Sequence, residues 1–429
     1  MSSSRLLNAR HALPGRDDIT RAELPNGIII LTRSNFDSPS VVLTGYLPAG
    51  GLFNPDGKLG LADFTASALM RGTAQRDFQH IYNALETVGA SLGFSGGTHN
   101  VEFGGRALVE DLDLLLALLA DALRDPVFPP EQVARLRAQL LTGLAIRDQD
   151  TSEMASMIFD QILYEGHPYS KPDDGYPETV SSITREDLEN FHRDHYGPRG
   201  MVISLVGAVD PAQALEKTAS VLGDWHNPAQ EDLPVLPTPK PLAETVRKMV
   251  SIPGKYQTDI LLGAIGPKRQ ASDYLAASLG NNILGQFGMY GRIGDTVRER
   301  QGLAYFAYSS VSGGIGPGPW YVSAGVNPAS VERAIDLIVE ELRRFVREPV
   351  TEEELADSQA NYVGRLPLSM ESNAGVAGAL LSLERYHLDL DYFRTYPEVL
   401  RAITRQQVLE AARNYLDPDR LAIAVAGPS

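Results

Sequence analysis

The strongest constraint on the fold of this chain is an internal repeat. Residues 183–207, ITREDLENFHRDHYGPRGMVISLVG, align without a gap with residues 403–427, ITRQQVLEAARNYLDPDRLAIAVAG. Each copy has the pattern of a helix with a threonine N-cap, a proline-containing turn and an apolar strand. Because chance agreement over so long an ungapped stretch is improbable, the repeat indicates a duplication and predicts two homologous domains.

A proline-rich stretch separates the two copies. Residues 227–242 contain Pro228, Pro234, Pro237, Pro239 and Pro241. Proline fixes φ and removes a backbone donor, so this stretch favours a semi-rigid linker over a helix or strand. We therefore predict an N-terminal domain at 1–226, a linker at 227–242 and a C-terminal domain at 243–429. A chain of 429 residues also exceeds the size of a typical single core.

The pattern of the first half predicts an α+β domain. Period-two and short apolar runs predict strands, and apolar residues at helical spacing predict helices. Strands followed by helices favour a mostly antiparallel sheet covered by helices, in each of the two homologous domains. The expected strands are 22–33 (with a turn at 25–27), 41–48, 90–95 and 101–108, and the expected helices are 61–70, 78–88, 111–123 and 131–147.

Composition excludes several classes of protein. Lys plus Arg is 38 and Asp plus Glu is 54, so the net charge of −16 opposes binding to nucleic acid or to an anionic membrane. The absence of cysteine excludes disulfides and thiolate metal sites. We find no apolar run long enough to cross a bilayer and no secretion signal in MSSSRLLNARHALPGRDD, so we expect a cytoplasmic protein.

Five motifs carry a resemblance that spans nearly the whole chain. They are LPNGIIIL at Leu24, GLADFTASALMRGT at Gly60, GHPYSKPDDG at Gly166, FHRDHYGPRGMVISLVGAVDP at Phe191 and VRERQGLAY at Val297. In this order they resemble the pitrilysin, or insulinase, zinc peptidases, and in particular the bacterial branch related to mitochondrial processing peptidase. The resemblance implies two homologous α+β domains arranged as a clamp.

Active members of that family carry His-x-x-Glu-His on a helix, where the two histidines hold zinc and the glutamate is the general base. The matching positions here are Asp63, Ala66 and Ser67, and the position of the third ligand falls on Gly143 or Leu144. These residues form a degenerate zinc motif, so we expect no metal in this chain. The simpler interpretation of Asp63 is a solvated carboxylate near a helix start.

A second family motif is intact. The resemblance implies that Arg298 and Tyr305 reach substrate from the second domain and donate to the scissile carbonyl. The alternative is a surface arginine and a core-strand tyrosine, and Arg300 is a less well placed substitute. The resemblance also makes the turn at Gly285, Gly288 and Gly291 a substrate-contacting loop.

Other sequence features are weaker. The glycines at 313–318 favour a plain hairpin connection, and the strand in GASLGFSGG suits an extended peptide on its edge. His192 and His195 lie three residues apart on a helix, which favours half-exposed helix residues over metal ligands. His167 precedes a proline and is expected to order its loop.

The leading hypothesis is a non-catalytic subunit of a heteromeric zinc metallopeptidase. Its partner would be a paralogous zinc-bearing chain, in a heterodimer or a dimer of heterodimers, and its substrate a peptide; we expect neither nucleic acid nor a membrane as a partner. Zinc is then a cofactor of the partner subunit. One alternative is a structural or assembly protein like the core proteins of the respiratory cytochrome complex. Another is a stand-alone enzyme with different chemistry, for which no motif is recognisable.

Overall fold

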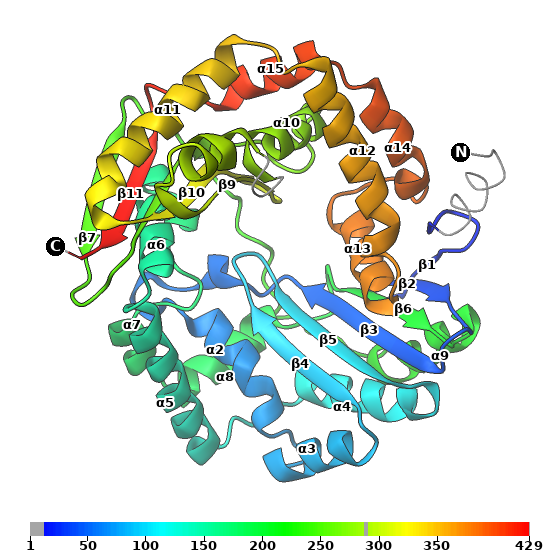
Figure 1. The fold of residues 1–429 in the computed structure, drawn as a ribbon. Coiled ribbons are helices and arrows are strands. Elements are labelled where there is room, and N and C mark those ends of the chain that lie inside the picture. Colours follow the sequence, from blue (N-terminus) through cyan, green and yellow to red (C-terminus); the bar gives the residue numbers. More distant parts are fainter. Residues whose placement is uncertain (1–12, 287–290, 429) are drawn as a thin grey trace. The chain divides into compact units, whose positions relative to one another are not determined.

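The computed structural model describes residues 13–286 and 291–428, and they form two compact units (Figure 1). Each unit contains one mixed β-sheet with helices packed on it. This confirms the predicted α+β class with two homologous domains. Among the described residues, unit 1 consists of residues 13–144, 172–235 and 366–395, and unit 2 of residues 145–171, 236–286, 291–365 and 396–428.

Sheet 1 belongs to unit 1 and has the strand order β1-β2-β6-β3-β5-β4. Neighbouring strands are antiparallel except for β2 and β6, which are parallel. The strands are β1 (Thr20–Glu23), β2 (Ile29–Ser34), β3 (Ser40–Leu47), β4 (Ser91–Gly96), β5 (Val101–Leu108) and β6 (Val202–Gly207).

Sheet 2 belongs to unit 2 and has the order β7-β11-β8-β10-β9, again with one parallel pair, β7 and β11. Apart from β1, the two sheets share one topology, and the repeated strand of the sequence becomes β6 in one and β11 in the other. The duplication is therefore visible in the fold. The strands are β7 (Val246–Ser251), β8 (Thr258–Ile265), β9 (Ala304–Gly313), β10 (Pro317–Val326) and β11 (Ala422–Gly427).

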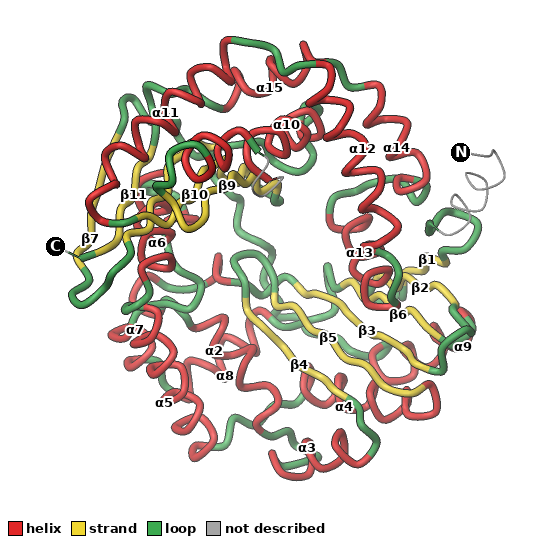
Figure 2. Tube along the Cα trace, viewed as in Figure 1, coloured by secondary structure: helices red, strands yellow, loops and turns green. Residues whose placement is uncertain are grey.

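Helices flank both sheets, as the red and yellow segments of Figure 2 show. In the first half of the chain they are α2 (Leu61–Ala68), α3 (Phe78–Thr87), α4 (Leu112–Arg124), α5 (Pro130–Arg147), α6 (Thr151–Leu163), α7 (Pro177–Ser182), α8 (Arg185–His195) and α9 (Pro211–Leu222). In the second half they are α10 (Tyr274–Asn281), α11 (Val331–Arg347), α12 (Glu352–Ser369), α13 (Asn373–Arg385), α14 (Tyr392–Ala402) and α15 (Arg405–Tyr415).

The compact units are not contiguous halves of the chain, because the halves exchange one segment each. Helix α13, from the second half, packs on β3 and β6 of sheet 1, whereas α6, from the first half, packs on β8 and β11 of sheet 2. All residues of β6 and β11 are buried, since both faces of these strands are covered. The clustering changes from unit 1 to unit 2 between residues 235 and 236, and the domain bounds 1–226 and 243–429 stay a prediction.

The two repeated helices begin as predicted. Thr184 accepts a hydrogen bond from the backbone N–H of Asp187, whose carboxylate accepts from the Thr184 N–H, and Thr404 and Gln407 form the same reciprocal pair. Each capping box satisfies two backbone donors at a helix start. Among the described residues, no helix combines the length and apolar character that a membrane span requires.

Candidate functional site

Helix α2 carries three of the degenerate motif positions. It begins after Gly60, whose φ of 92° lies in the left-handed region that glycine adopts without strain. The side chain of Asn54 accepts a hydrogen bond from the backbone N–H of Ala62 at 2.8 Å, which satisfies one of the free donors of the first turn. Asp63, Ala66 and Ser67 then share one face of the helix because they lie three and four residues apart.

Asp63 is not the solvated carboxylate that we expected. Its side chain is largely buried, and Oδ1 accepts a hydrogen bond of 3.2 Å from the backbone N–H of Gly96. Burial raises the pKa of Asp63 to about 6, against the effect of that hydrogen bond, and the charges of Asp174 and Asp173 raise it further. Strand β4 approaches α2 this closely because Gly96 has no side chain: a Cβ there would lie 2.5 Å from the Cα of Asp63.

Zinc chemistry does not fit the donors at these positions. Ala66 and Gly143 offer no ligand atom, Leu144 is buried in the apolar core, and Ser67 is a neutral hydroxyl. Tight zinc sites need histidine or cysteine, which leaves Asp63 as a single carboxylate. Within residues 13–286 and 291–428, no group of three or more His, Cys, Asp or Glu side chains is arranged to hold a metal ion.

Two further aspartates, which the sequence analysis missed, lie beside Asp63. The carboxylate of Asp173 accepts a hydrogen bond of 2.8 Å from the hydroxyl of Thr98, in the turn between β4 and β5. Burial raises the pKa of Asp173 as well, and the charge of exposed Asp174 adds to the effect. These residues were in the motif GHPYSKPDDG, but nothing in their spacing indicates proximity to α2.

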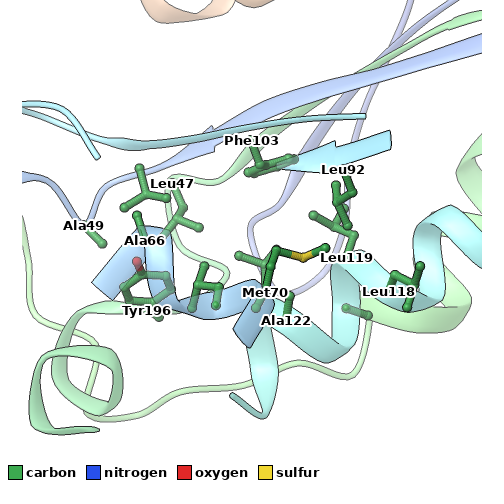
Figure 3. Packing of buried hydrophobic residues seen from close by; sticks show 14 of the residues in the cluster. Leu47, Ala49, Ala66, Met70, Leu92, Phe103, Leu118, Leu119, Ala122 and Tyr196 are labelled. Atoms are coloured by element: carbon green, nitrogen blue, oxygen red, sulfur yellow. The ribbon is translucent and has the colours of Figure 1, made fainter. Parts of the chain in front are cut away.

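Tyr196 belongs to the apolar core of unit 1 and lies beside α2. Figure 3 shows its hydroxyl oxygen directed toward the part of α2 that carries Ala66, within the apolar core of unit 1. The ring is 1% exposed, and the hydroxyl makes no hydrogen bond within the described chain. Burial raises the pKa of Tyr196 well above its usual value, and the charge of Asp63 contributes to the rise. Tyr196 therefore stays a neutral phenol with an unsatisfied hydroxyl group.

In unit 2, Arg298 lies in the last turn of a π-helical segment, Gly294–Glu299. Single turns of π-helix are rare and occur frequently at functional sites. Arg298 is half-exposed, and in the part of the chain that the structure describes its ion-pair partner is Glu299, whose carboxylate lies 3.9 Å from Nε, too far for a hydrogen bond. Arg300, the substitute candidate, pairs with Asp295 at 2.6 Å. Of these two arginines, Arg298 is therefore the one with the longer contact to a carboxylate among the described residues.

Tyr305 lies on an edge strand of sheet 2. It lies on β9, the last strand of that sheet, and 61% of the residue is exposed to solvent, so it is not a core-strand tyrosine. A backbone hydrogen bond of 2.9 Å from the N–H of Gly302 to the carbonyl of Arg298 closes the turn between the two candidate residues. The structure thus places a half-exposed guanidinium and an exposed phenol, both hydrogen-bond donors, at the two ends of one short connection.

In the predicted substrate-contacting loop, close backbone contacts explain why residues 285 and 291 are glycine. A Cβ on Gly291 would lie 2.6 Å from the Cα of Gly285, and one on Gly285 would lie 2.4 Å from the backbone N of Ser309. The two ends of the loop therefore touch, and only glycine fits there. Gly288 lies outside the described residues. The substrate role of this loop stays a prediction.

Arg292, which sequence reasoning missed, fixes the C-terminal end of the same loop. Its guanidinium donates two hydrogen bonds of 2.7 Å to Glu354 of α12. Glu341 lies 3.6 Å away and is nearly buried. The bidentate pair is a strong contact because both groups are charged and largely shielded from water.

Three histidines that the sequence singled out, His167, His192 and His195, make contacts within unit 1 or their own loop. His192 Nε2 contacts the backbone carbonyl of Leu123 at 2.9 Å, and the ring of His195 stacks on Phe53 with the centroids 4.2 Å apart. His167 accepts from the N–H of Tyr169 and orders its loop, as predicted. The second glycine cluster also behaves as predicted, since it connects β9 and β10 in a hairpin.

Comparison with known proteins identifies the family. The profile for Insulinase (Peptidase family M16) matches residues 29–172, and the profile for the Peptidase M16 inactive domain matches residues 182–362. Together the two profiles span both units, and the chain belongs to the M16 peptidase family. This confirms the resemblance at the level of the family.

Curated relatives align over most of the chain. An uncharacterized zinc protease of Streptomyces coelicolor is 25% identical over 375 residues, which cover 86% of this chain and 80% of the relative. Another, from Mycobacterium leprae, is 26% identical over 414 residues, covering 96% and 92%.

Solved structures share the fold. A crystal structure described as a peptidase M16 inactive domain from Pseudomonas fluorescens is 27% identical, with a TM-score of 0.89 over 96% of this chain and 98% of that one. A protease from Helicobacter pylori is 18% identical, with a TM-score of 0.88 over 97% and 100%, and supports the fold alone.

Proposed function

We propose that this chain is the non-catalytic subunit of a heteromeric M16 zinc metallopeptidase. A paralogous subunit with an intact His-x-x-Glu-His motif would bind zinc and supply the general base. This chain would contribute Arg298 and Tyr305 to cleavage of a peptide at the partner's zinc. The curated relatives described as zinc proteases support peptide hydrolysis as the activity of the assembly.

The observation that carries the proposal is a contrast between the two units. In unit 1 the motif positions hold one carboxylate, a methyl group and a hydroxyl, and they cannot bind and activate a zinc-bound water. In unit 2 Tyr305 is exposed and Arg298 is half-exposed, and within the described residues the recorded carboxylate partner of Arg298 is 3.9 Å away. A guanidinium and a phenol both donate hydrogen bonds, so they suit a carbonyl oxygen that gains negative charge in the transition state.

The test is reconstitution with the zinc-bearing paralogue and measurement of kcat and KM on a peptide substrate. Arg298→Ala and Tyr305→Phe should each lower kcat, by about 10²–10³-fold for loss of an oxyanion donor. The chain offers matched controls: Arg300→Ala removes an exposed arginine that pairs with Asp295, and Tyr308→Phe changes another exposed tyrosine of β9. Neither control should change kcat.

The proposal fails if Arg298→Ala leaves kcat unchanged while the variant still assembles with its partner. Assembly is measured separately by size-exclusion chromatography, so that a loss of cleavage is not confused with a loss of the complex. A chain that assembles with a complex without any peptidase activity would instead indicate a structural role.

A further inference from the structure

We propose that β7, a terminal strand of sheet 2, pairs antiparallel with β7 of a second copy of this chain, with Met249 on the two-fold axis. The pairing would join two copies of sheet 2 into one continuous sheet. It goes beyond the proposed function, because it needs no paralogue and no residue of the candidate site. In an assembly with the paralogue, the same contact would join two heterodimers.

The duplication shows that sheet 2 lacks a strand that sheet 1 has. Strands β2 and β7 are equivalent, since each is parallel to the repeated strand, β6 or β11. In sheet 1, β1 pairs antiparallel with the outer edge of β2. Among the described strands, β7 pairs only with β11 and ends its sheet (Figure 1). Within residues 13–286 and 291–428, the outer edge of β7 therefore has no partner strand.

The segment before β7 does not supply the missing strand. It contains Pro237, Pro239 and Pro241, which have no backbone N–H to donate to a neighbouring strand. Nε2 of His167 lies 2.9 Å from the carbonyl oxygen of Pro237 and so fixes the segment elsewhere in unit 2. In unit 1 the equivalent segment forms β1 and the turn that leads into β2. No segment of the described chain therefore covers β7 as β1 covers β2.

The outer edge of β7 presents hydrogen-bonding groups at every second residue. The backbone N–H groups of Val246 and Ile252 point toward β11, because they donate to backbone carbonyls there at 2.9 and 2.8 Å. Neighbouring residues of a strand point to opposite sides, so Arg247, Met249 and Ser251 direct their N–H and C=O groups outward. All three residues are exposed. The edge can therefore accept an antiparallel strand that offers the same pattern.

The side-chain charges of β7 select one register for self-pairing. With the axis at Met249, Arg247 lies opposite Ser251 of the second copy, and Lys248 lies opposite Val250. No like charges then stand directly opposite each other. An axis at Arg247 or at Lys248 would place two cations opposite each other, which is destabilising. A second copy of the chain therefore fits this edge in the register centred on Met249.

Three further features favour the register centred on Met249. A shift of the axis by one residue toward the C-terminus would place Arg247 opposite Pro253, which has no N–H to pair. The charge of Arg247 is balanced within unit 2, since its guanidinium donates hydrogen bonds of 2.8 and 2.6 Å to Glu332 of α11. Met249 is 57% exposed, and its counterpart on the axis would cover it. Self-pairing therefore buries apolar surface without bringing unbalanced charges together.

Because the chain has no cysteine, a single introduced cysteine tests the contact directly. Opposite residues of a hydrogen-bonded antiparallel pair have Cα atoms about 5.5 Å apart, within the span of about 4.4–6.8 Å that a disulfide bridges. Met249→Cys should therefore form a disulfide-linked dimer in oxidised glutathione. The control is Tyr256→Cys, at a position that is 91% exposed in the loop after β7. Met249→Cys should cross-link about tenfold or more faster than this control, because pairing raises the local concentration of the two thiols.

Two more cysteine variants test the register. Arg247→Cys and Ser251→Cys should each cross-link slowly alone, because each residue would lie about 13 Å from its own counterpart along the paired strands. A mixture of the two variants should cross-link rapidly, because position 247 of one copy lies opposite position 251 of the other. This pattern is specific to the register centred on Met249.

Sedimentation velocity of the chain without its paralogue measures the same association without oxidation. The wild type should pass from monomer to dimer within about 1–100 μM, as expected for a small interface. Met249→Pro removes the outward N–H on the axis and should leave the chain monomeric. Met249→Ala keeps that N–H and should still dimerise.

Any of three results would overturn the proposal. They are a wild type that stays monomeric throughout this range, a Met249→Pro variant that still dimerises, and a Met249→Cys variant that cross-links no faster than Tyr256→Cys. A monomeric wild type would leave the edge of β7 to a segment of another protein. Circular dichroism of each variant distinguishes a loss of the dimer from a loss of folding. None of these results bears on the proposed function, which is measured on the mixture with the paralogue.

Discussion

Replacing Asp63 by asparagine should stabilise unit 1 at neutral pH. In the folded chain burial raises the pKa of Asp63 from 3.8 to about 6. The folded state therefore holds the proton more tightly than the unfolded state, and stability falls as pH rises from about 4 to 6. Above that window the full cost of the buried charge is present, about 3 kcal/mol for a shift of about two units. Asparagine keeps the acceptor for the Gly96 N–H and carries no charge.

The size of the gain should follow pH in a defined way. The free energy of unfolding of the variant should exceed that of the wild type by about 3 kcal/mol near pH 7.5, by about 1.5 kcal/mol near pH 5, and by almost nothing below about pH 3, where Asp63 is protonated in both the folded and the unfolded wild type. Trp225 in unit 1 and Trp320 in unit 2 are the only tryptophans of the chain. Urea unfolding followed by Trp225 fluorescence, in a Trp320→Phe background, therefore reports on unit 1.

The control for this experiment is Asp37→Asn in the same background, which should not change the free energy of unfolding at any of these pH values. A gain for Asp63→Asn that is the same at pH 5 and pH 7.5 would refute the reasoning. So would a loss of stability at pH 7.5, because it would mean that the ionised carboxylate is stabilising in the folded chain.

Two further predictions concern the loop in unit 2. Gly291→Ala should destabilise the chain by about 1–3 kcal/mol in thermal unfolding, because the new Cβ would lie 2.6 Å from the Cα of Gly285. The control is Gly143→Ala, which should be neutral or stabilising because Gly143 lies in a helix with open space around it; equal effects of the two variants would contradict the close contact. Burial opposes ionisation of Glu354, but hydrogen bonds led by that of Arg292 outweigh it and lower the pKa to about 2. The Arg292–Glu354 pair therefore stabilises the fold above pH 4.5, and this stabilisation is lost as pH falls toward 2. Glu354→Gln should lower the unfolding temperature at pH 7 but not near pH 2. An equal effect at both pH values would contradict this role.

Much of the fold could be predicted because its signals are local. The repeat at 183–207 and 403–427 contains its own N-cap, turn and strand, and each of these forms where the pattern places it. The exchange of α6 and α13 could not be predicted in the same way. Continuous apolar runs in β6 and β11 indicate strands covered on both faces, but they do not say which helix covers the second face.

The candidate site could likewise be predicted from the sequence only in part. The motif positions on α2 follow from spacing, and the donor chemistry of Asp63, Ala66 and Ser67 can be judged from the sequence. The burial of Asp63 depends on the approach of β4, which a glycine 33 residues away permits. The neighbouring Asp173 lies in a loop that is distant from α2 in the sequence. Such contacts depend on tertiary structure, and no periodic pattern in the sequence indicates them.

The measurement that tests the central claim most directly is the zinc content and peptidase activity of the purified chain, alone and mixed with its zinc-bearing paralogue. We expect the chain alone to retain no stoichiometric zinc after dialysis and to cleave no peptide, and the mixture to cleave at a rate that depends on Arg298. One zinc per chain that is lost on Asp63→Asn, or cleavage by the chain alone that a chelator abolishes, would contradict a non-catalytic role.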